Sequence, residues 1–259
     1  MHPILFQIGS LNIHTYGLLV ATGVFAGILI FHRECKKLGL SSNEITDFAV
    51  YIILASLVGA RLFYVITDFN YYLKNPLEII FSRSGFVFYG GFLAGALTAV
   101  GLTIFKKYPF WKVSDAVALA LTLGHSIGRL GCFFQGCCYG KITTSPLGIR
   151  FPQGSTVADC LGVDPFSLLT PPVFPTQLFE SAGLFLIFLI LFFYKKYKSD
   201  FVPGFLILLY GIMYGSLRFC IEFLRFDFRG GYFYGLSISQ WIAVFIIILA
   251  TIMLFLRKK

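Results

Sequence analysis

Seven apolar runs constrain this chain more than any other feature. Each comes close to the roughly 20 residues that an α-helix needs to cross a hydrocarbon layer. They occupy residues 16–32, 46–66, 86–105, 114–134, 176–194, 203–224 and 236–256. The chain is 57% hydrophobic and 13% charged, which leaves too few polar residues to cover a soluble domain of 259 residues. The sequence therefore predicts an all-α polytopic membrane protein with seven transmembrane helices.

The basic residues between the runs predict the orientation. Twelve Lys and Arg residues follow the first, third, fifth and seventh runs, and five follow the even-numbered runs. Because cytoplasmic loops carry the excess of Lys and Arg, we expect the N-terminus outside and the C-terminus in the cytoplasm. These loops hold most of the net charge of +9, and anionic lipid headgroups account for it better than nucleic acid does.

One connection is much longer than the others. Residues 136–175 are rich in Gly, Pro, Thr and Ser and fall on the outside. Loops of this length are usually functional or partly structured, so we expect a small extracytoplasmic cap, with a lid that grips substrate as the alternative. The chain contains no linker and no convincing internal repeat, which predicts a single transmembrane domain over residues 1–259.

Three arginines lie a few residues short of the outer end of three outward-running helices. They are Arg61, Arg129 and Arg218. A charge at the centre of a membrane helix costs at least about 2.5 kcal/mol, and less near the interface. Three such charges at one predicted depth indicate a shared role. The alternative is that they snorkel or form ion pairs with Glu180, Glu222 and Asp227.

The helices that run from outside to inside start with polar side chains, at the same predicted depth in the membrane as the three arginines. Tyr16, Tyr89, Gln177 and Glu180 are the main examples. A guanidinium presents a planar fork of donors that fits a phosphate. The pattern thus predicts a site for a phosphodiester anion at headgroup depth in the outer leaflet.

Helix starts and spacings add local predictions. Ser41 or Ser42 is expected to cap the second helix, with Glu44 in its first turn. Arg218, Glu222 and Arg225 are spaced i, i+4, i+7 and share one helix face. We expect Glu222 to pair with one of these guanidinium groups and to leave the other available.

The motifs resemble the bacterial prolipoprotein diacylglyceryl transferase family. The stretch "GRLGCFFQGCCYG", residues 128–140, is similar to its signature G-R-x-G-N-F-x-N-G-E-x-x-G. The stretches "IHTYGLL", "GARLFYV", "FPTQLFE" and "LRFCIEFLR" resemble four further family motifs in the same order and spacing.

The resemblance implies a transferase of the bacterial cytoplasmic membrane that needs no cofactor. Its substrates would be the membrane lipid phosphatidylglycerol and the lipobox cysteine thiol of a preprolipoprotein. Arg129 and Arg218 are expected to bind the lipid phosphate, with Arg61 in support. The other residues expected at the substrate are Tyr16, Gly90, Gly91, Cys132, Gly136, Gly140, Gln177, Glu180, Glu222 and Arg225.

Two departures from the family motifs keep alternatives open. Tyr89 stands where the family has a histidine, and Cys132 and Cys137 replace an asparagine and an acidic residue. With an unperturbed pKa of about 10, tyrosine is a poor base at neutral pH. His125, four residues before Arg129, is therefore a candidate base beside Tyr89. A relative that uses the same lipid with another acceptor nucleophile is the alternative function.

The cysteines around residue 135 allow two further interpretations. Zinc sites usually combine two separated C-x2-4-C pairs, which are absent here, so we expect no metal at Cys132, Cys137 and Cys138. A disulfide from Cys137 or Cys138 to Cys160 is the alternative. A transporter is a third functional class, but it would place charges near the membrane midplane.

Overall fold

The computed structural model covers most of the chain. The structure describes residues 4–9, 11–81, 85, 87–164, 167–198, 200–226 and 231–257. Four of the basic residues used to predict the orientation lie outside these ranges, namely Arg83, Arg229, Lys258 and Lys259, and so does Asp227.

Long helices occur at all seven apolar runs. They are α1 Thr15–Lys36, α2 Ser42–Thr67, α5 Phe88–Phe105, α6 Phe110–Gln135, α8 Thr176–Tyr197, α9 Phe205–Glu222 and α10 Ile238–Arg257. Six of them are long and apolar enough to cross a membrane, and α5 is a shorter apolar helix. A polytopic membrane protein is thereby confirmed, while seven spans and their orientation stay predictions.

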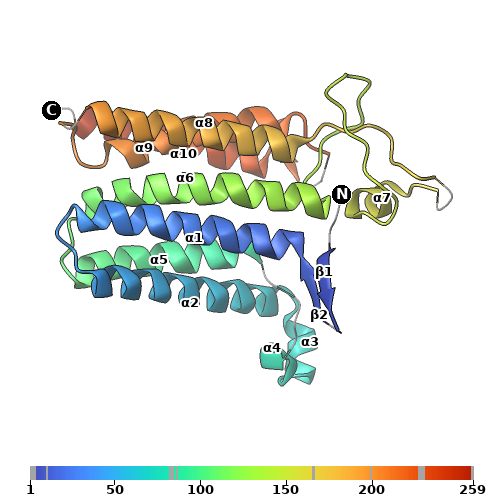
Figure 1. Cartoon of the computed structure of the whole chain (residues 1–259), viewed down its shortest axis with the longest axis horizontal. Coiled ribbons are helices and arrows are strands. Elements are labelled where there is room, and N and C mark those ends of the chain that lie inside the picture. Colours follow the sequence, from blue (N-terminus) through green and yellow to red (C-terminus); the bar gives the residue numbers. More distant parts are fainter. Residues whose placement is uncertain are drawn as a thin grey trace. The chain divides into compact units, whose positions relative to one another are not determined.

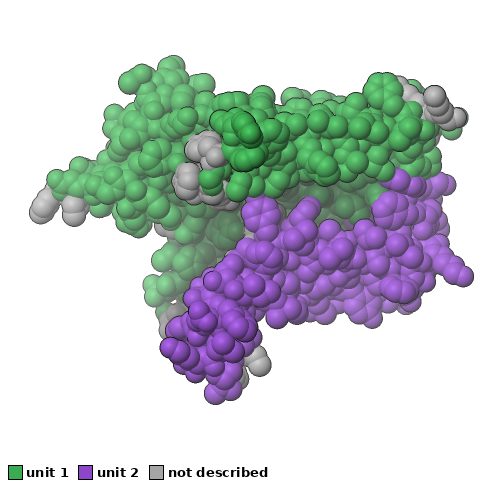
Figure 2. Space-filling model, turned by 180° about the vertical axis from the view of Figure 1, so that it is seen from behind, with its two compact units in different colours: residues 1–30, 114–259 green, residues 31–113 purple. Residues whose placement is uncertain are grey.

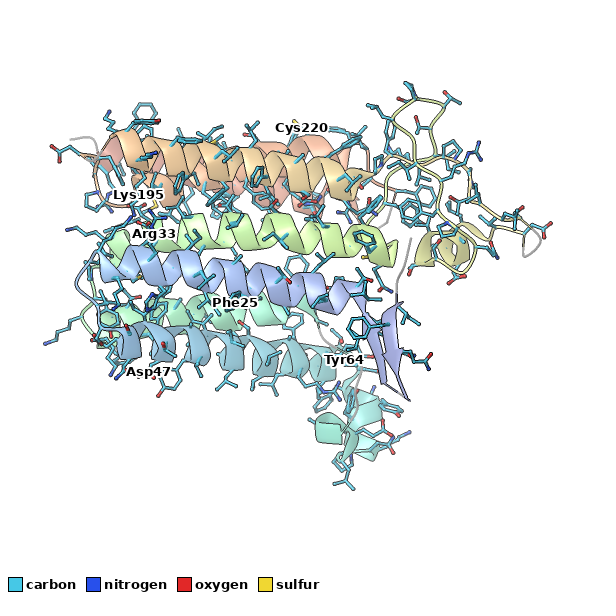
Figure 3. The ribbon with its side chains drawn as sticks, in the orientation of Figure 1. Phe25, Arg33, Asp47, Tyr64, Lys195 and Cys220 are labelled. Atoms are coloured by element: carbon cyan, nitrogen blue, oxygen red, sulfur yellow. The ribbon has the colours of Figure 1, made fainter. Side chains whose placement is uncertain are left out.

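The helices show the surface expected of lipid-facing segments. Large apolar side chains are exposed along their lengths, and Phe25 in the middle of α1 is 62% exposed. Lys195 lies in the last turns of α8 (Figure 3). Exposed apolar middles with charged ends are what a bilayer favours.

The chain divides into two compact units, which Figure 2 colours separately. Unit 1 comprises residues 1–30 and 114–259, and unit 2 comprises residues 31–113. The single transmembrane domain stays a prediction.

Unit 1 is a helical bundle in which α8, α9 and α10 lie side by side (Figure 1). Its main core joins α6, α8 and α9 through buried side chains such as Leu119, Leu184 and Leu206. The backbones of α1 and α6 touch, because a Cβ added at Gly23 would lie 2.6 Å from the carbonyl oxygen of Gly124. Such close approach requires small residues at the crossing point.

A buried carboxylate fixes the start of α9. The Asp115 carboxylate accepts hydrogen bonds from the backbone N–H groups of Gly204 at 2.7 Å and Ile207 at 3.0 Å. These two donors belong to the first turn, where backbone N–H groups have no partner within the helix.

Unit 2 is built on α2 and α5. Ser41 caps α2 in a capping box with Glu44, which confirms the predicted helix start. Gly91 lies against α2, since a Cβ there would be 2.9 Å from the Ser56 carbonyl oxygen. Two short helices, α3 Phe69–Lys74 and α4 Glu78–Phe81, follow α2.

The long connection in unit 1 forms a packed substructure rather than an open loop. It contains α7 Thr156–Leu161 and a small core of Tyr139, Phe151, Val157 and Val173. The extracytoplasmic cap and its alternative, a lid that grips substrate, both stay predictions.

Two hairpins were not predicted. They join β1 Ile4–Ile8 to β2 Leu11–His14 and β3 Tyr232–Phe233 to β4 Leu236–Ser237. Each leads directly into a long helix, α1 or α10.

Candidate active site

Arg129 forms a buried ion pair across unit 1. Its Nη2 on α6 lies 2.8 Å from Oε1 of Glu180 on α8, whose side chain is wholly buried. The structure therefore shows Arg129 in an ion pair with Glu180, which was the alternative to an arginine without an ionic partner. Among the described residues, Nε of Arg129 and Oε2 of Glu180 have no hydrogen-bond partner, so the guanidinium keeps a donor for a further acceptor.

Tyr214 links this pair to the second arginine. Its hydroxyl donates to Oε1 of Glu180 at 3.3 Å. Tyr214 also lies four residues, one helical turn, before Arg218 on α9. Arg129 and Arg218 thus belong to one polar region of unit 1.

His125 lies behind the ion pair, one helical turn before Arg129. Its Nε2 is 4.0 Å from Oε1 of Glu180, and its ring meets the ring of Tyr214 edge-on with centroids 5.3 Å apart. His125 is therefore placed to support Glu180. Whether it acts as a base stays a prediction.

The Glu222 carboxylate forms ion pairs with two arginines. Its Oε2 lies 2.7 Å from Nη2 of Arg218 and 3.8 Å from Nε of Arg225. Arg218 and Glu222 share a face of α9 as predicted, but α9 ends at Glu222, so Arg225 lies in the turn beyond the helix. The expectation that Glu222 would pair with only one arginine is wrong. The chain bends just after α9 ends, which brings Arg225, only 6% exposed, back to the same carboxylate.

Further contacts fix this second pair. Ser237 donates its hydroxyl to Oε1 of Glu222 at 3.0 Å, and Nη2 of Arg218 reaches Ser239 at 3.5 Å. Nη1 of Arg218 is buried and has no hydrogen-bond partner among the described residues. Arg218 therefore resembles Arg129, with its charge balanced by a glutamate and one donor still available.

Arg61 belongs to unit 2, where it organises the segment after α2. Its Nε donates to the carbonyl of Ile79 at 2.8 Å, its Nη1 donates to Gly85 at 3.0 Å, and Nη2 donates to Glu78. The guanidinium also faces the ring of Tyr72, 5.4 Å from its centroid. These contacts are structural, and the predicted support for Arg129 and Arg218 stays a prediction.

The other predicted residues of unit 2 begin α5. A Cβ at Gly90 would lie 2.5 Å from the Gly59 carbonyl oxygen, so Gly90, like Gly91, allows α5 to approach α2. Tyr89 is exposed. Helix packing accounts for the two glycines, and their contact with substrate stays a prediction.

The turn after α6 is held from α8. Gly136 ends α6 with a φ of 74°, a conformation that favours glycine. The next two carbonyl groups accept hydrogen bonds at 2.7 Å, Cys137 from Nε2 of Gln177 and Cys138 from Oγ1 of Thr176. Gln177, predicted at the substrate, thus fixes the backbone of the turn.

Gly140 occupies a crowded position beyond this turn. A Cβ there would lie 2.6 Å from the carbonyl oxygen of Leu224 and 2.8 Å from that of Phe174. Its own N–H donates to Phe174 at 2.9 Å. Gly140 is therefore needed to bring the turn beside the segment that carries Arg225, with which it forms a β-bridge.

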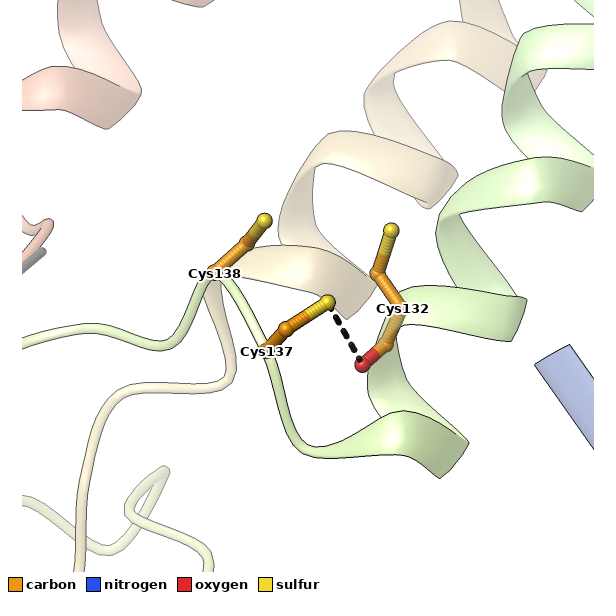
Figure 4. Close-up of side chains that lie close together, drawn as sticks. All are labelled: Cys132, Cys137 and Cys138. Atoms are coloured by element: carbon orange, nitrogen blue, oxygen red, sulfur yellow. Dashed lines mark hydrogen bonds between the residues drawn. The ribbon is translucent and has the colours of Figure 1, made fainter. Parts of the chain in front are cut away.

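The turn gathers three thiols (Figure 4). The sulfur atoms of Cys132, Cys137 and Cys138 lie within 4.8 Å of one another. All six cysteines are thiols and Cys160 is exposed in α7, so the alternative of a disulfide to Cys160 is wrong. The hydrogen bonds with the neighbouring thiols of Cys132 and Cys138 raise the pKa of Cys137 above its ordinary value.

Tyr16 on α1 packs against the last turns of α6, next to Cys132. A Cβ at Gly131 would lie 3.2 Å from the Tyr16 ring. The residues of unit 1 that the sequence predicted at the substrate therefore gather where α6 and α9 end and α8 begins. Their contact with substrate stays a prediction.

Sequence reasoning missed Tyr214. Tyr214 precedes Arg218 by four residues, so it shares the helix face of that arginine, and this spacing was the available signal.

Comparisons with known proteins show which family the chain resembles. The family model described as prolipoprotein diacylglyceryl transferase matches residues 3–256. Three similar proteins are named phosphatidylglycerol-prolipoprotein diacylglyceryl transferase. The one from Clostridium tetani is 34% identical over 96% of this chain and 95% of its own length. Those from Finegoldia magna and Streptococcus mutans are 36% and 33% identical over 100% of this chain and 97% and 96% of theirs.

Proposed function

The chain belongs to the prolipoprotein diacylglyceryl transferase family, and we propose that it transfers the diacylglyceryl group of phosphatidylglycerol to the lipobox cysteine of preprolipoproteins. The acceptor sulfur attacks carbon 3 of the diacylglyceryl moiety and forms a thioether. The bond from that carbon to the phosphate oxygen breaks, and glycerol phosphate leaves with the electron pair. The match over nearly the whole chain is the observation that carries this proposal.

Two arginines of unit 1 suit the departing phosphate. Negative charge grows on the phosphate as the carbon–oxygen bond breaks, and donors already in position stabilise it most effectively. Arg129 and Arg218 are each oriented by a glutamate, at 2.8 Å and 2.7 Å. Each also keeps a buried donor without a partner among the described residues. We assign these donors to the phosphate and Tyr16 to the headgroup.

The acceptor must react as a thiolate. A free cysteine has a pKa of about 8.5, so only a few per cent of it is ionised at neutral pH. Positive charge from Arg129 and Arg218 favours the thiolate as well as the leaving phosphate. Tyr89 and His125 are the candidate proton acceptors in this proposal.

The proposed orientation brings this chemistry to the outer leaflet of the bacterial cytoplasmic membrane. The excess of basic residues after the odd-numbered runs supports it. Seven apolar runs, an odd number, would place the two termini on opposite sides of the membrane. A fluorescent protein that folds only in the cytoplasm, fused after residue 259, should fluoresce. The same protein fused before residue 1 should stay dark.

The assay combines the purified enzyme, phosphatidylglycerol vesicles and a lipobox peptide. Mass spectrometry should find the peptide enlarged by one diacylglyceryl group, with no such product from the peptide whose cysteine is replaced by serine. A relative with another acceptor would consume phosphatidylglycerol without forming the thioether. A transporter would leave both substrates chemically unchanged.

A further inference from the structure

Three thiols that meet on a fixed turn form a cluster of ligands for a soft metal ion. Cys132 lies in the last turn of α6, and Cys137 and Cys138 lie in the turn that follows. The spacing of these cysteines along the chain predicts no metal and the family resemblance implies no cofactor, but from this geometry we propose that the three cysteines bind a zinc ion and leave its fourth position to the thiol of the acceptor. The role of that position rests on the proposed transfer reaction.

The distances fit zinc with a small adjustment. A zinc–sulfur bond of about 2.3 Å in a tetrahedral site separates the sulfur atoms by about 3.8 Å. The three sulfur atoms already lie within 4.8 Å of one another, so each pair would need to close by at most about 1 Å. A disulfide would use only two of the three thiols.

The backbone presents the ligands in a fixed arrangement. Gly136 and Cys138 both have positive φ angles, 74° and 62°. This left-handed conformation is uncommon for residues other than glycine and clusters at functional sites. Gln177 and Thr176 hold the carbonyl groups of Cys137 and Cys138 from α8, which resembles the outer contacts that orient metal ligands.

Charge and ligand type favour zinc. Thiolates select zinc and other soft ions, and three of them on Zn²⁺ leave one net negative charge. Arg129 lies three residues before Cys132 on α6, and its positive charge would offset that negative charge. Catalytic zinc sites keep three protein ligands and one open position.

An open position on zinc could hold the nucleophile. A thiol that coordinates zinc loses its proton outright, and the proton would pass to solvent. The acceptor sulfur would then attack carbon 3 of the lipid while glycerol phosphate leaves toward Arg129 and Arg218, and the neutral thioether, a weaker ligand than a thiolate, would dissociate. With zinc bound, the metal would take over the deprotonation for which Tyr89 and His125 are otherwise the candidates.

Metal content tests the site independently of transfer. The full chain is purified in detergent from zinc-supplemented cells and analysed by elemental mass spectrometry. We expect about one zinc per chain, as a single three-thiolate site holds, in the native protein and in the Cys160→Ser control. Cys132→Ser, Cys137→Ser and Cys138→Ser should each lose the zinc.

A double variant guards against simple misfolding. Cys132→Asn with Cys137→Glu installs the residues of the family signature, so the fold should accept it, and it should bind no zinc. Cobalt(II) provides a spectroscopic readout of the open position. The cobalt-loaded protein should show a thiolate charge-transfer band that changes with the lipobox peptide but not with its serine counterpart.

The outcomes separate the two proposals. Absence of zinc from the native protein, copper in its place, or full transfer by the zinc-free chain would each overturn the zinc site and leave the transfer reaction standing. Bound zinc with no thioether from any preparation would instead refute the proposed function.

Discussion

Replacing Arg129 by alanine should have two separable effects. Glu180 is wholly buried and its carboxylate lies 2.8 Å from the guanidinium. Removing one partner of a buried pair strands the other charge and typically costs about 3–5 kcal/mol of stability. Removing a positioned donor from a developing anion costs about 100- to 1000-fold in rate. Arg129→Ala should therefore lower both thermal stability and transfer.

A second substitution distinguishes these effects. Glu180→Gln, added to Arg129→Ala, removes the stranded charge and keeps a side-chain oxygen that can accept from the Tyr214 hydroxyl. The double variant should regain most of the lost stability, because no buried charge lacks a partner. Transfer should stay as low as in Arg129→Ala, because the phosphate donor is still missing.

Thermal unfolding in detergent and thioether formation from a lipobox peptide measure the two quantities on one preparation. Activity that returns together with stability in the double variant would refute the reasoning. Arg129 would then serve only to neutralise Glu180.

Three further substitutions test other parts of the account. His125→Gln should keep the transfer rate within about 10-fold of the native rate. The reason is that His125 makes one weak contact with Glu180, and its loss raises the activation free energy by about 1.4 kcal/mol at most. A larger loss of the peptide-transfer rate would identify His125 as a base. Gly140→Ala should lower the unfolding temperature and the transfer rate, because the added Cβ would overlap two carbonyl oxygens. The control Gly128→Ala has open space around it and should keep the native unfolding temperature and transfer rate. Equal behaviour of the two variants would contradict the argument that Gly140 is crowded. Ser41→Ala should cost about 1 kcal/mol of stability by removing the cap of α2 without changing transfer, and unchanged unfolding would show that the cap contributes nothing.

The sequence predicted what depends on local physics. Hydrophobic run lengths located the long helices, and the capping box at Ser41 and Glu44 follows from residues three apart. The ion pair of Arg218 with Glu222 follows from i, i+4 spacing on one helix. The return of Arg225 to the same carboxylate depends on the bend after α9, which spacing along a continuous helix does not describe.

Contacts between distant segments were beyond such reasoning. Arg129 and Glu180 are 51 residues apart, so only the packing of α6 against α8 brings them together. The thiols of Cys132, Cys137 and Cys138 would point to different faces of a continuous helix. They converge because α6 ends and the chain turns back at Gly136.

The ratio of the two products, thioether and glycerol phosphate, tests the central claim most directly. With purified enzyme, phosphatidylglycerol and lipobox peptide, thioether and glycerol phosphate should accumulate in equal amounts as the lipid disappears. Lipid consumption that releases glycerol phosphate without matching thioether would contradict transfer to the cysteine thiol.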